Sequence, residues 1–132
     1  MSDRSDDVPP ALHELESEVM ELMWELGEVN VRTVLEELNR RSDKERKYTT
    51  VMTIMVRLDT KGLLTRRREG RTDLYQPRLT REQYREARAQ ADVRALVERH
   101  GEAALVHFAR HMDELDPKRR QQLRRLARRE PS

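Results

Sequence analysis

Apolar residues recur three and four positions apart along three segments in the first half of the chain, at residues 12–26, 31–41 and 51–58. This spacing places them on one face of an α-helix, with polar residues on the opposite face. In the first segment we expect the glutamates, Glu16 among them, to lie on the solvent-exposed side. The pattern therefore predicts three amphipathic helices that share one core. The predicted buried positions are Leu12, Leu15, Val19, Leu22, Met23, Leu26, Val31, Val34, Leu35, Leu38, Val51, Ile54, Met55 and Leu58.

Residues typical of helix ends stand at the borders of these segments. Gly27 follows the first helix and Gly62 follows the third, both in positions where glycine ends helices. Asn30 can cap the second helix by accepting a hydrogen bond from its first turn. Thr49 or Thr50 can do the same for the third.

A β-hairpin is predicted directly after the third helix. Residues 63–68 and 72–76 have the composition of strands, and 69–71 form the turn between them. Gly70 can adopt the positive φ that tight turns require, and Pro77 closes the second strand because it has no amide hydrogen. Three helices followed by a hairpin is the order of a winged helix-turn-helix.

The rest of the chain is predicted to be helical. Thr80 with Gln83 forms a capping box, Gly101 interrupts the helical pattern, and Asp116 followed by Pro117 is a typical helix start. We expect helices over about 81–99, about 102–112, and from residue 117 onward.

These three C-terminal helices are too small to bury their apolar stripes among themselves, so we expect them to pack on a second copy of the chain. The alternative is that they fold back on the winged region of the same chain. We therefore expect a mostly α-helical protein with three parts: a disordered tail over 1–10, a winged-helix DNA-binding domain over 11–78, and a helical dimerisation domain over 79–132. The candidate dimerisation residues are Leu96, Leu105, Phe108, Met112, Leu123 and Leu126.

Charge is unevenly distributed along the chain. Residues 1–30 contain nine acidic and one basic residue, whereas residues 31–79 contain thirteen basic and seven acidic residues. A basic middle segment in a chain of net charge +2 suggests a polyanionic partner. The alternative is an arginine-rich surface that is only solvated.

The third helix and the hairpin carry the residue types that contact duplex DNA. Threonine and methionine can contact bases in the major groove, and arginine binds guanine or phosphate. Basic residues beside the turn can hold the phosphate backbone. The alternatives are an exposed helix face and a solvated hairpin, and for Tyr48 packing at the start of the helix instead of against a sugar-phosphate. The candidate DNA-binding residues are Tyr48, Thr49, Thr50, Met52, Thr53, Arg57, Arg66, Arg67, Arg68 and Arg71.

Several function classes are disfavoured. There is no cysteine, no apolar run of the roughly 20 residues that span a bilayer, and no signal peptide, so we expect a cytoplasmic protein. No glycine-rich phosphate loop or activated nucleophile is present, so we expect no enzyme, no catalytic residue and no cofactor. His107 and His111 have a metal-ligand spacing but lack further ligands, so we expect no metal site. A winged-helix module that binds proteins is the alternative function.

Three stretches resemble the BlaI/MecI/CopY family of bacterial repressors, the penicillinase repressor group. They are LESEVMELMWELG, YTTVMTIMVRLDTKGLLTRRREGRTDLYQP and EAALVHFARHMDELD. The resemblance implies a homodimeric, non-enzymatic transcriptional repressor that binds an inverted-repeat operator. It also implies control of β-lactamase or related antibiotic resistance genes, and inactivation by a membrane sensor-protease that cuts the dimerisation helices.

Two departures from the family pattern concern its switches. The cut in the best-known branch lies at an Asn-Phe step, and the matching step here is His107-Phe108. This step is the candidate cleavage site. The copper-responsive branch carries a C-terminal cysteine cluster, which a chain without cysteine lacks.

Overall fold

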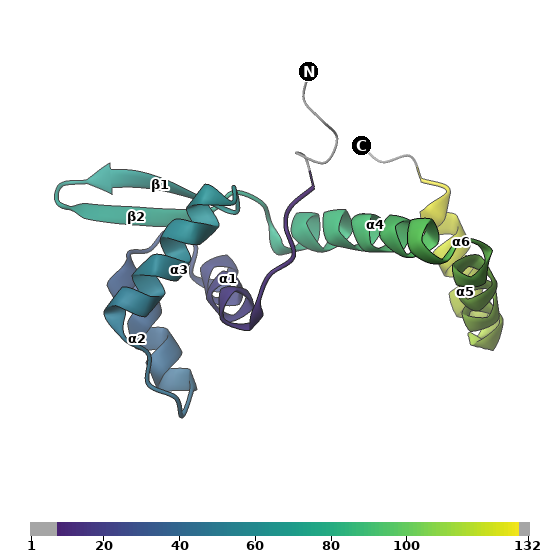
Figure 1. Cartoon of the computed structure of the whole chain (residues 1–132), viewed down its shortest axis with the longest axis horizontal. Coiled ribbons are helices and arrows are strands. Elements are labelled where there is room, and N and C mark those ends of the chain that lie inside the picture. The colour runs from purple at the N-terminus through teal and green to yellow at the C-terminus, as the bar shows by residue number, and fades with distance from the viewer. Residues whose placement is uncertain (1–7, 130–132) are drawn as a thin grey trace, which may run out of the picture. The chain divides into compact units, whose positions relative to one another are not determined.

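Eight elements make up residues 8–129, the part of the chain that the computed structural model describes (Figure 1). They divide into two compact units between Gln90 and Ala91. Three helices, a two-stranded hairpin and further helices match the predicted fold class, which is therefore confirmed. In chain order the elements are α1 (Glu14–Leu26), α2 (Val31–Arg41), α3 (Tyr48–Thr60), β1 (Leu64–Glu69), β2 (Thr72–Pro77), α4 (Arg81–His100), α5 (Glu102–Glu114) and α6 (Pro117–Ala127).

One hydrophobic core holds the first unit together. It gathers the apolar faces of α1, α2 and α3, as the helical spacing predicts, and Leu12, Leu15 and Leu26 pack at its edge. Leu63, Leu64 and Tyr75 close it from the hairpin side. The core residues are Val19, Met20, Leu22, Met23, Val31, Val34, Leu35, Leu38, Val51, Ile54, Met55, Leu58, Leu63, Leu64 and Tyr75.

The helix ends follow the sequence prediction with one exception. Asn30 caps α2, because its side-chain oxygen accepts a hydrogen bond of 2.9 Å from the amide of Thr33. The prediction that Thr49 or Thr50 caps α3 is wrong. The helix begins earlier, with Lys47 as an extended N-cap whose carbonyl accepts from the amides of Thr50 and Val51. Both threonines therefore lie inside the first turn, with their side chains exposed.

The hairpin is tied to the helices by a short bridge. Its strands pair antiparallel from Leu64 opposite Pro77 to Glu69 opposite Thr72, around a turn in which Gly70 has a φ of 63°. Val29, between α1 and α2, exchanges two backbone hydrogen bonds of 3.0 and 2.9 Å with Tyr75 on β2. The hairpin is consequently a fixed extension of the helical domain (Figure 1).

The first half of α4 belongs to the winged unit, which differs from the predicted boundary after residue 78. The rings of Trp24 on α1 and Tyr84 on α4 lie 5.5 Å apart, and the indole of Trp24 donates to the carbonyl of Leu79 at 2.8 Å. Aromatic packing across these two helices fixes the start of α4.

The backbone before α1 is held as well. Tyr84 and Arg88 donate to the carbonyls of Pro10 and Pro9. Of the predicted tail, residues 1–7 lie outside the described residues.

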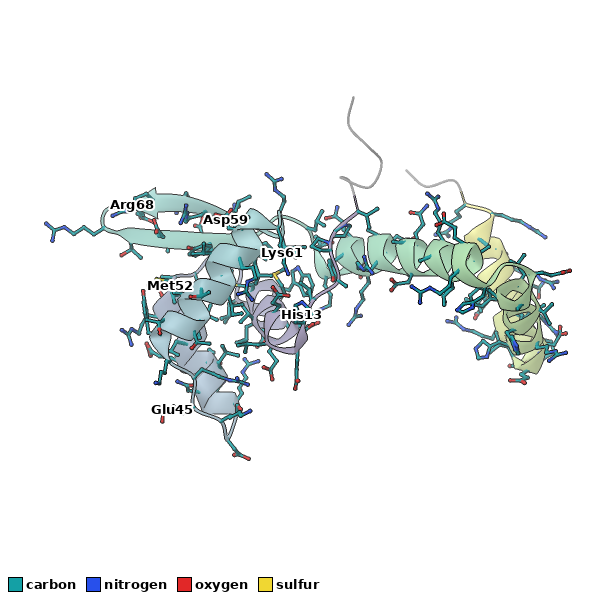
Figure 2. All side chains as sticks on the ribbon, in the orientation of Figure 1. His13, Glu45, Met52, Asp59, Lys61 and Arg68 are labelled. Atoms are coloured by element: carbon teal, nitrogen blue, oxygen red, sulfur yellow. The ribbon has the colours of Figure 1, made fainter. Side chains whose placement is uncertain are left out.

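Glu16 is buried, contrary to the expectation that it faces solvent. Its side chain is 1% exposed and accepts hydrogen bonds from the amide of His13 at 3.0 Å and from the ammonium of Lys61 at 2.7 Å. Figure 2 shows His13 before α1 and Lys61 after α3. Burial by itself raises the pKa of Glu16, but the His13 amide and Lys61 outweigh it, so the pKa lies below its ordinary value. The carboxylate therefore joins the start of α1 to the end of α3.

The second unit has almost no core of its own. From residue 91 to residue 129 no side chain is buried, although α5 and α6 are well formed. Gly101 takes a φ of 58° between α4 and α5, and Asp116 caps α6, as the sequence predicts.

No helix among residues 8–129 combines the length and the apolar character that crossing a membrane demands.

Candidate nucleic-acid interface

The exposed face of α3 combines threonines and Arg57 with the partly exposed apolar side chains of Tyr48, Met52 and Val56. Because Val51, Ile54, Met55 and Leu58 point into the core, the remaining positions of the helix face solvent. Hydroxyl groups and an arginine on a helix can hydrogen-bond to base edges and phosphates in a major groove. The exposed candidates on α3 are Thr49, Thr50, Met52, Thr53 and Arg57.

Four arginines surround the hairpin turn, and all are exposed. Arg66 reaches back towards α3, where its side chain lies 3.7 Å from Asp59. Interaction with Tyr75, and then with Asp59, raises the pKa of Arg66, which therefore keeps its charge. Arg68, on the same strand (Figure 2), lies 3.7 Å from Asp73. These pairs are long and exposed, so they hold the two arginines only weakly.

Arg67 differs from its neighbours. It forms a two-pronged ion pair with Glu28, with both nitrogen–oxygen distances at 2.8 Å, and a further contact of 3.1 Å with Glu69. The hydrogen bond from Arg67 is the main reason why the pKa of Glu28 is lowered. Parallel pairing of this kind is the strong geometry for a guanidinium. Arg67 therefore fastens the hairpin to the segment between α1 and α2, and its role in DNA binding stays a prediction.

A groove runs between the start of α2, the face of α3 and the hairpin. Its volume is about 340 Å³. We call it the helix–wing groove. It brings together four predicted site residues, Tyr48, Met52, Arg66 and Arg71, whereas the threonines, Arg57, Arg67 and Arg68 lie outside it. The groove is lined by Asn30, Val31, Arg32, Tyr48, Met52, Val56, Arg66, Arg71, Thr72, Asp73 and Tyr75.

Arg32 is the groove residue that sequence reasoning missed. It lies on the first turn of α2, and its guanidinium carbon sits 4.9 Å from the centre of the Tyr48 ring. Tyr48 thus packs at the start of α3 and still keeps 40% of its surface exposed. The available signal was a basic residue directly after the predicted cap of α2, but the contact with Tyr48 spans the loop between two helices.

The candidate dimerisation residues lie on an apolar surface of the second unit. Leu96, Leu105, Phe108 and Leu126 are exposed, with Leu105 at 54%, and Met112 and Leu123 are half-buried. The candidate cleavage step, His107 and Phe108, lies in the middle of α5. Among residues 8–129 no three histidine, aspartate or glutamate side chains gather in a way that could hold a metal ion.

Comparison with known proteins finds a matching family and relatives of this chain. The penicillinase repressor family matches residues 12–129. The transcriptional regulator BlaI of Mycobacterium tuberculosis (strain CDC 1551 / Oshkosh) is 40% identical over 114 residues, which cover 83% of this chain and 80% of that protein. The penicillinase repressor of Bacillus licheniformis is 32% identical over 80 residues, and the match covers 61% of each chain, less than two thirds of the Bacillus protein.

A solved structure supports the first unit specifically. The solution structure of the DNA-binding domain of the repressor BlaI shares 32% identity and a TM-score of 0.50, and the match covers 58% of this chain and 90% of that domain. The family match spans both units, and the structural match supplies the winged helix-turn-helix. The protein therefore belongs to the penicillinase repressor family, whose members are DNA-binding transcriptional repressors rather than enzymes.

Proposed function

We propose that the protein represses transcription by binding an inverted-repeat operator as a homodimer. Each protomer places α3 in a major groove and lays its hairpin along the adjacent backbone. The observation that carries the proposal is the geometry of the first unit. The buried face of α3 leaves an opposite face that carries threonines and Arg57, and Arg66 and Arg71 of the hairpin share a groove with α3. Base contacts from the helix give specificity, whereas phosphate contacts from the hairpin fix its position.

The second unit supports pairing with another copy of this chain. Leu105, Phe108 and Met112 follow one another at helical spacing along α5, and no residue from 91 to 129 is buried. Isolated helices of this length are marginal in water, so α5 and α6 need a partner surface to be stable. An apolar stripe on each protomer is self-complementary in a two-fold dimer. Two half-sites, one helical turn or a multiple of it apart, then face two α3 helices.

The regulated genes and the inactivating signal are proposed from the relatives. Two of them are named penicillinase repressor and BlaI, which favours β-lactamase or related resistance genes as targets. Proteolysis between His107 and Phe108 would cut α5 through its apolar stripe and separate the protomers. A membrane sensor-protease is the proposed partner for that step.

Specific recognition by α3 is tested with the Thr53→Ala and Arg57→Ala variants. Each should weaken binding to a duplex selected by the wild-type protein from a random-sequence pool by about tenfold, within the 1–3 kcal/mol typical of a base contact. Binding to an unselected duplex should change less. Thr60→Ala, at the far end of α3, is the matched control and should bind normally. Electrophoretic mobility shifts give the affinities, and equal losses on both duplexes would show that these residues contact only phosphate.

The hairpin arginines should differ in whether they contact phosphate. Affinity for DNA falls as the salt concentration rises. We expect Arg71→Ala to make the slope of log affinity against log salt concentration less steep by about 1, because one phosphate contact is lost. Arg67→Ala should leave that slope unchanged, because Arg67 is already occupied by Glu28. Titrations of a fixed duplex at several salt concentrations measure both. Binding that does not depend on salt at all would favour a protein-interaction module instead.

A further inference from the structure

We propose that the helix–wing groove holds one deoxyribose-phosphate unit of the operator backbone, and that Arg32 on α2 is a phosphate ligand there. The inference rests on the proposed function and adds to it a binding subsite and a residue outside the recognition helix and the hairpin.

The groove combines an apolar surface with a cationic border. Tyr48, Met52 and Val56 keep between 38% and 40% of their surface exposed there. Exposed apolar side chains in a concave site commonly mark a binding surface. A deoxyribose presents mainly C–H groups and fits such a surface. The phosphate on either side of the sugar would then reach the border of the groove.

That border carries a net positive charge. Three arginines, Arg32, Arg66 and Arg71, and one acid, Asp73, line the groove. Asp73 also lies 3.7 Å from Arg68, so part of its charge is offset from outside the groove. An excess of guanidinium groups around a nucleotide-sized space matches a phosphate diester, which carries one negative charge.

Arg32 is held in place without being neutralised. Its guanidinium lies over the ring of Tyr48, a contact that orients the plane and leaves its N–H edges available. Within residues 8–129 no carboxylate oxygen lies within 4.0 Å of Arg32, whereas Arg66 and Arg67 both have acidic neighbours. Of the basic residues at the groove, Arg32 is also the one carried by α2. A phosphate bound there would connect α2, α3 and the hairpin, and so fix the angle at which α3 enters the major groove.

The first experiment measures how affinity for a fixed duplex depends on salt. We expect Arg32→Ala to make the slope of log affinity against log salt concentration less steep by about 1, because one phosphate contact is lost. Arg40→Ala is the matched control on the same helix. Arg40 lies outside the groove, pairs with Glu37 at 2.7 Å, and should leave the slope unchanged. Arg32→Lys should restore part of the slope, because the charge is kept and the stacked plane is lost. The thermal unfolding of all three variants should match that of the wild-type protein, which would show that each variant is folded.

The second experiment locates the phosphate. Single methylphosphonate linkages, which carry no charge, are placed one at a time along the selected duplex. In the wild-type complex several positions should weaken binding, and at one of them the loss should disappear in Arg32→Ala. That coupling identifies the phosphate that Arg32 binds. If the wild-type protein binds the duplex but no linkage couples to Arg32, the groove proposal is overturned and the proposed function stands. If the wild-type protein binds no duplex, both fail.

Discussion

The full-length Leu105→Asp variant is expected to be monomeric and to bind its operator at least about a hundredfold more weakly than the wild-type protein, because linked half-site binding typically contributes factors of 10² to 10⁴. Leu105 is the most exposed large apolar residue of the second unit. A carboxylate at that position would be buried without a partner in an apolar interface, which opposes association strongly. The isolated half-site should be bound almost normally, because α3 and the hairpin are untouched.

Ala103→Asp is the matched control for this prediction. It introduces the same side chain two positions earlier on α5, on the opposite side of the helix from Leu105. We expect it to remain dimeric. Sedimentation equilibrium gives the dimer dissociation constant, and mobility shifts on full and half operators give the affinities. Two aspartate variants with the same dissociation constant as the wild-type protein would show that α5 does not form the interface.

A truncated chain offers an independent check of the same idea. The contacts of Trp24 with Leu79 and Tyr84 hold the start of α4 on the winged unit, so the chain is best ended after Gln90. Ending it after Pro77 would remove Tyr84 and expose the indole. The longer fragment should fold as a monomer and match the half-site affinity of Leu105→Asp. A fragment that kept the full operator affinity would argue against dimerisation through the second unit.

The parts of the fold that the sequence predicts well are those set by neighbours in the chain. The apolar spacing of α1, α2 and α3 assigns their buried faces, and the single substantial surprise among the polar positions is Glu16. Asn30 and Gly70 are equally local, because a cap and a tight turn each depend on a few adjacent residues. The same reasoning identifies the exposed face of α3, since it is what remains when the core face is assigned.

Contacts between distant segments account for what the sequence does not show. Glu16 on α1 meets Lys61 at the end of α3, and Arg67 on the hairpin meets Glu28 between α1 and α2. Helical periodicity places Glu16 on the solvated face of α1, because the spacing of apolar residues gives no information about a cation from a distant part of the chain. The helix–wing groove is a further example, because Arg32 becomes a candidate ligand only when α2 and α3 place it over Tyr48. Ion pairs between distant segments, such as that of Arg67 with Glu28, therefore identify the arginines that have a structural role.

Replacing Lys61 with methionine should destabilise the protein by about 2 kcal/mol, because the buried carboxylate of Glu16 loses its charged hydrogen-bond partner. Methionine keeps the apolar stem of lysine and removes the ammonium that lies 2.7 Å from Glu16. The carboxylate, 1% exposed, would keep the His13 amide but lose its counter-charge. Lys44→Met, in the exposed loop before α3, makes the same substitution without a buried partner and should have little effect on the free energy of unfolding.

The pH dependence tests whether the loss comes from charge. In the wild-type protein the pKa of Glu16 is lowered, so the stability that its ionised form contributes is complete above the ordinary glutamate pKa of about 4.3 and disappears as the pH falls through the lower folded value. In Lys61→Met burial is no longer offset by the ammonium, the folded pKa rises, and protonation relieves the variant. The difference in unfolding free energy between the two proteins should therefore be largest near neutral pH and shrink on acidification. Denaturant unfolding across this range measures it, and a constant difference would mean that Lys61 acts through packing and not through its charge on Glu16.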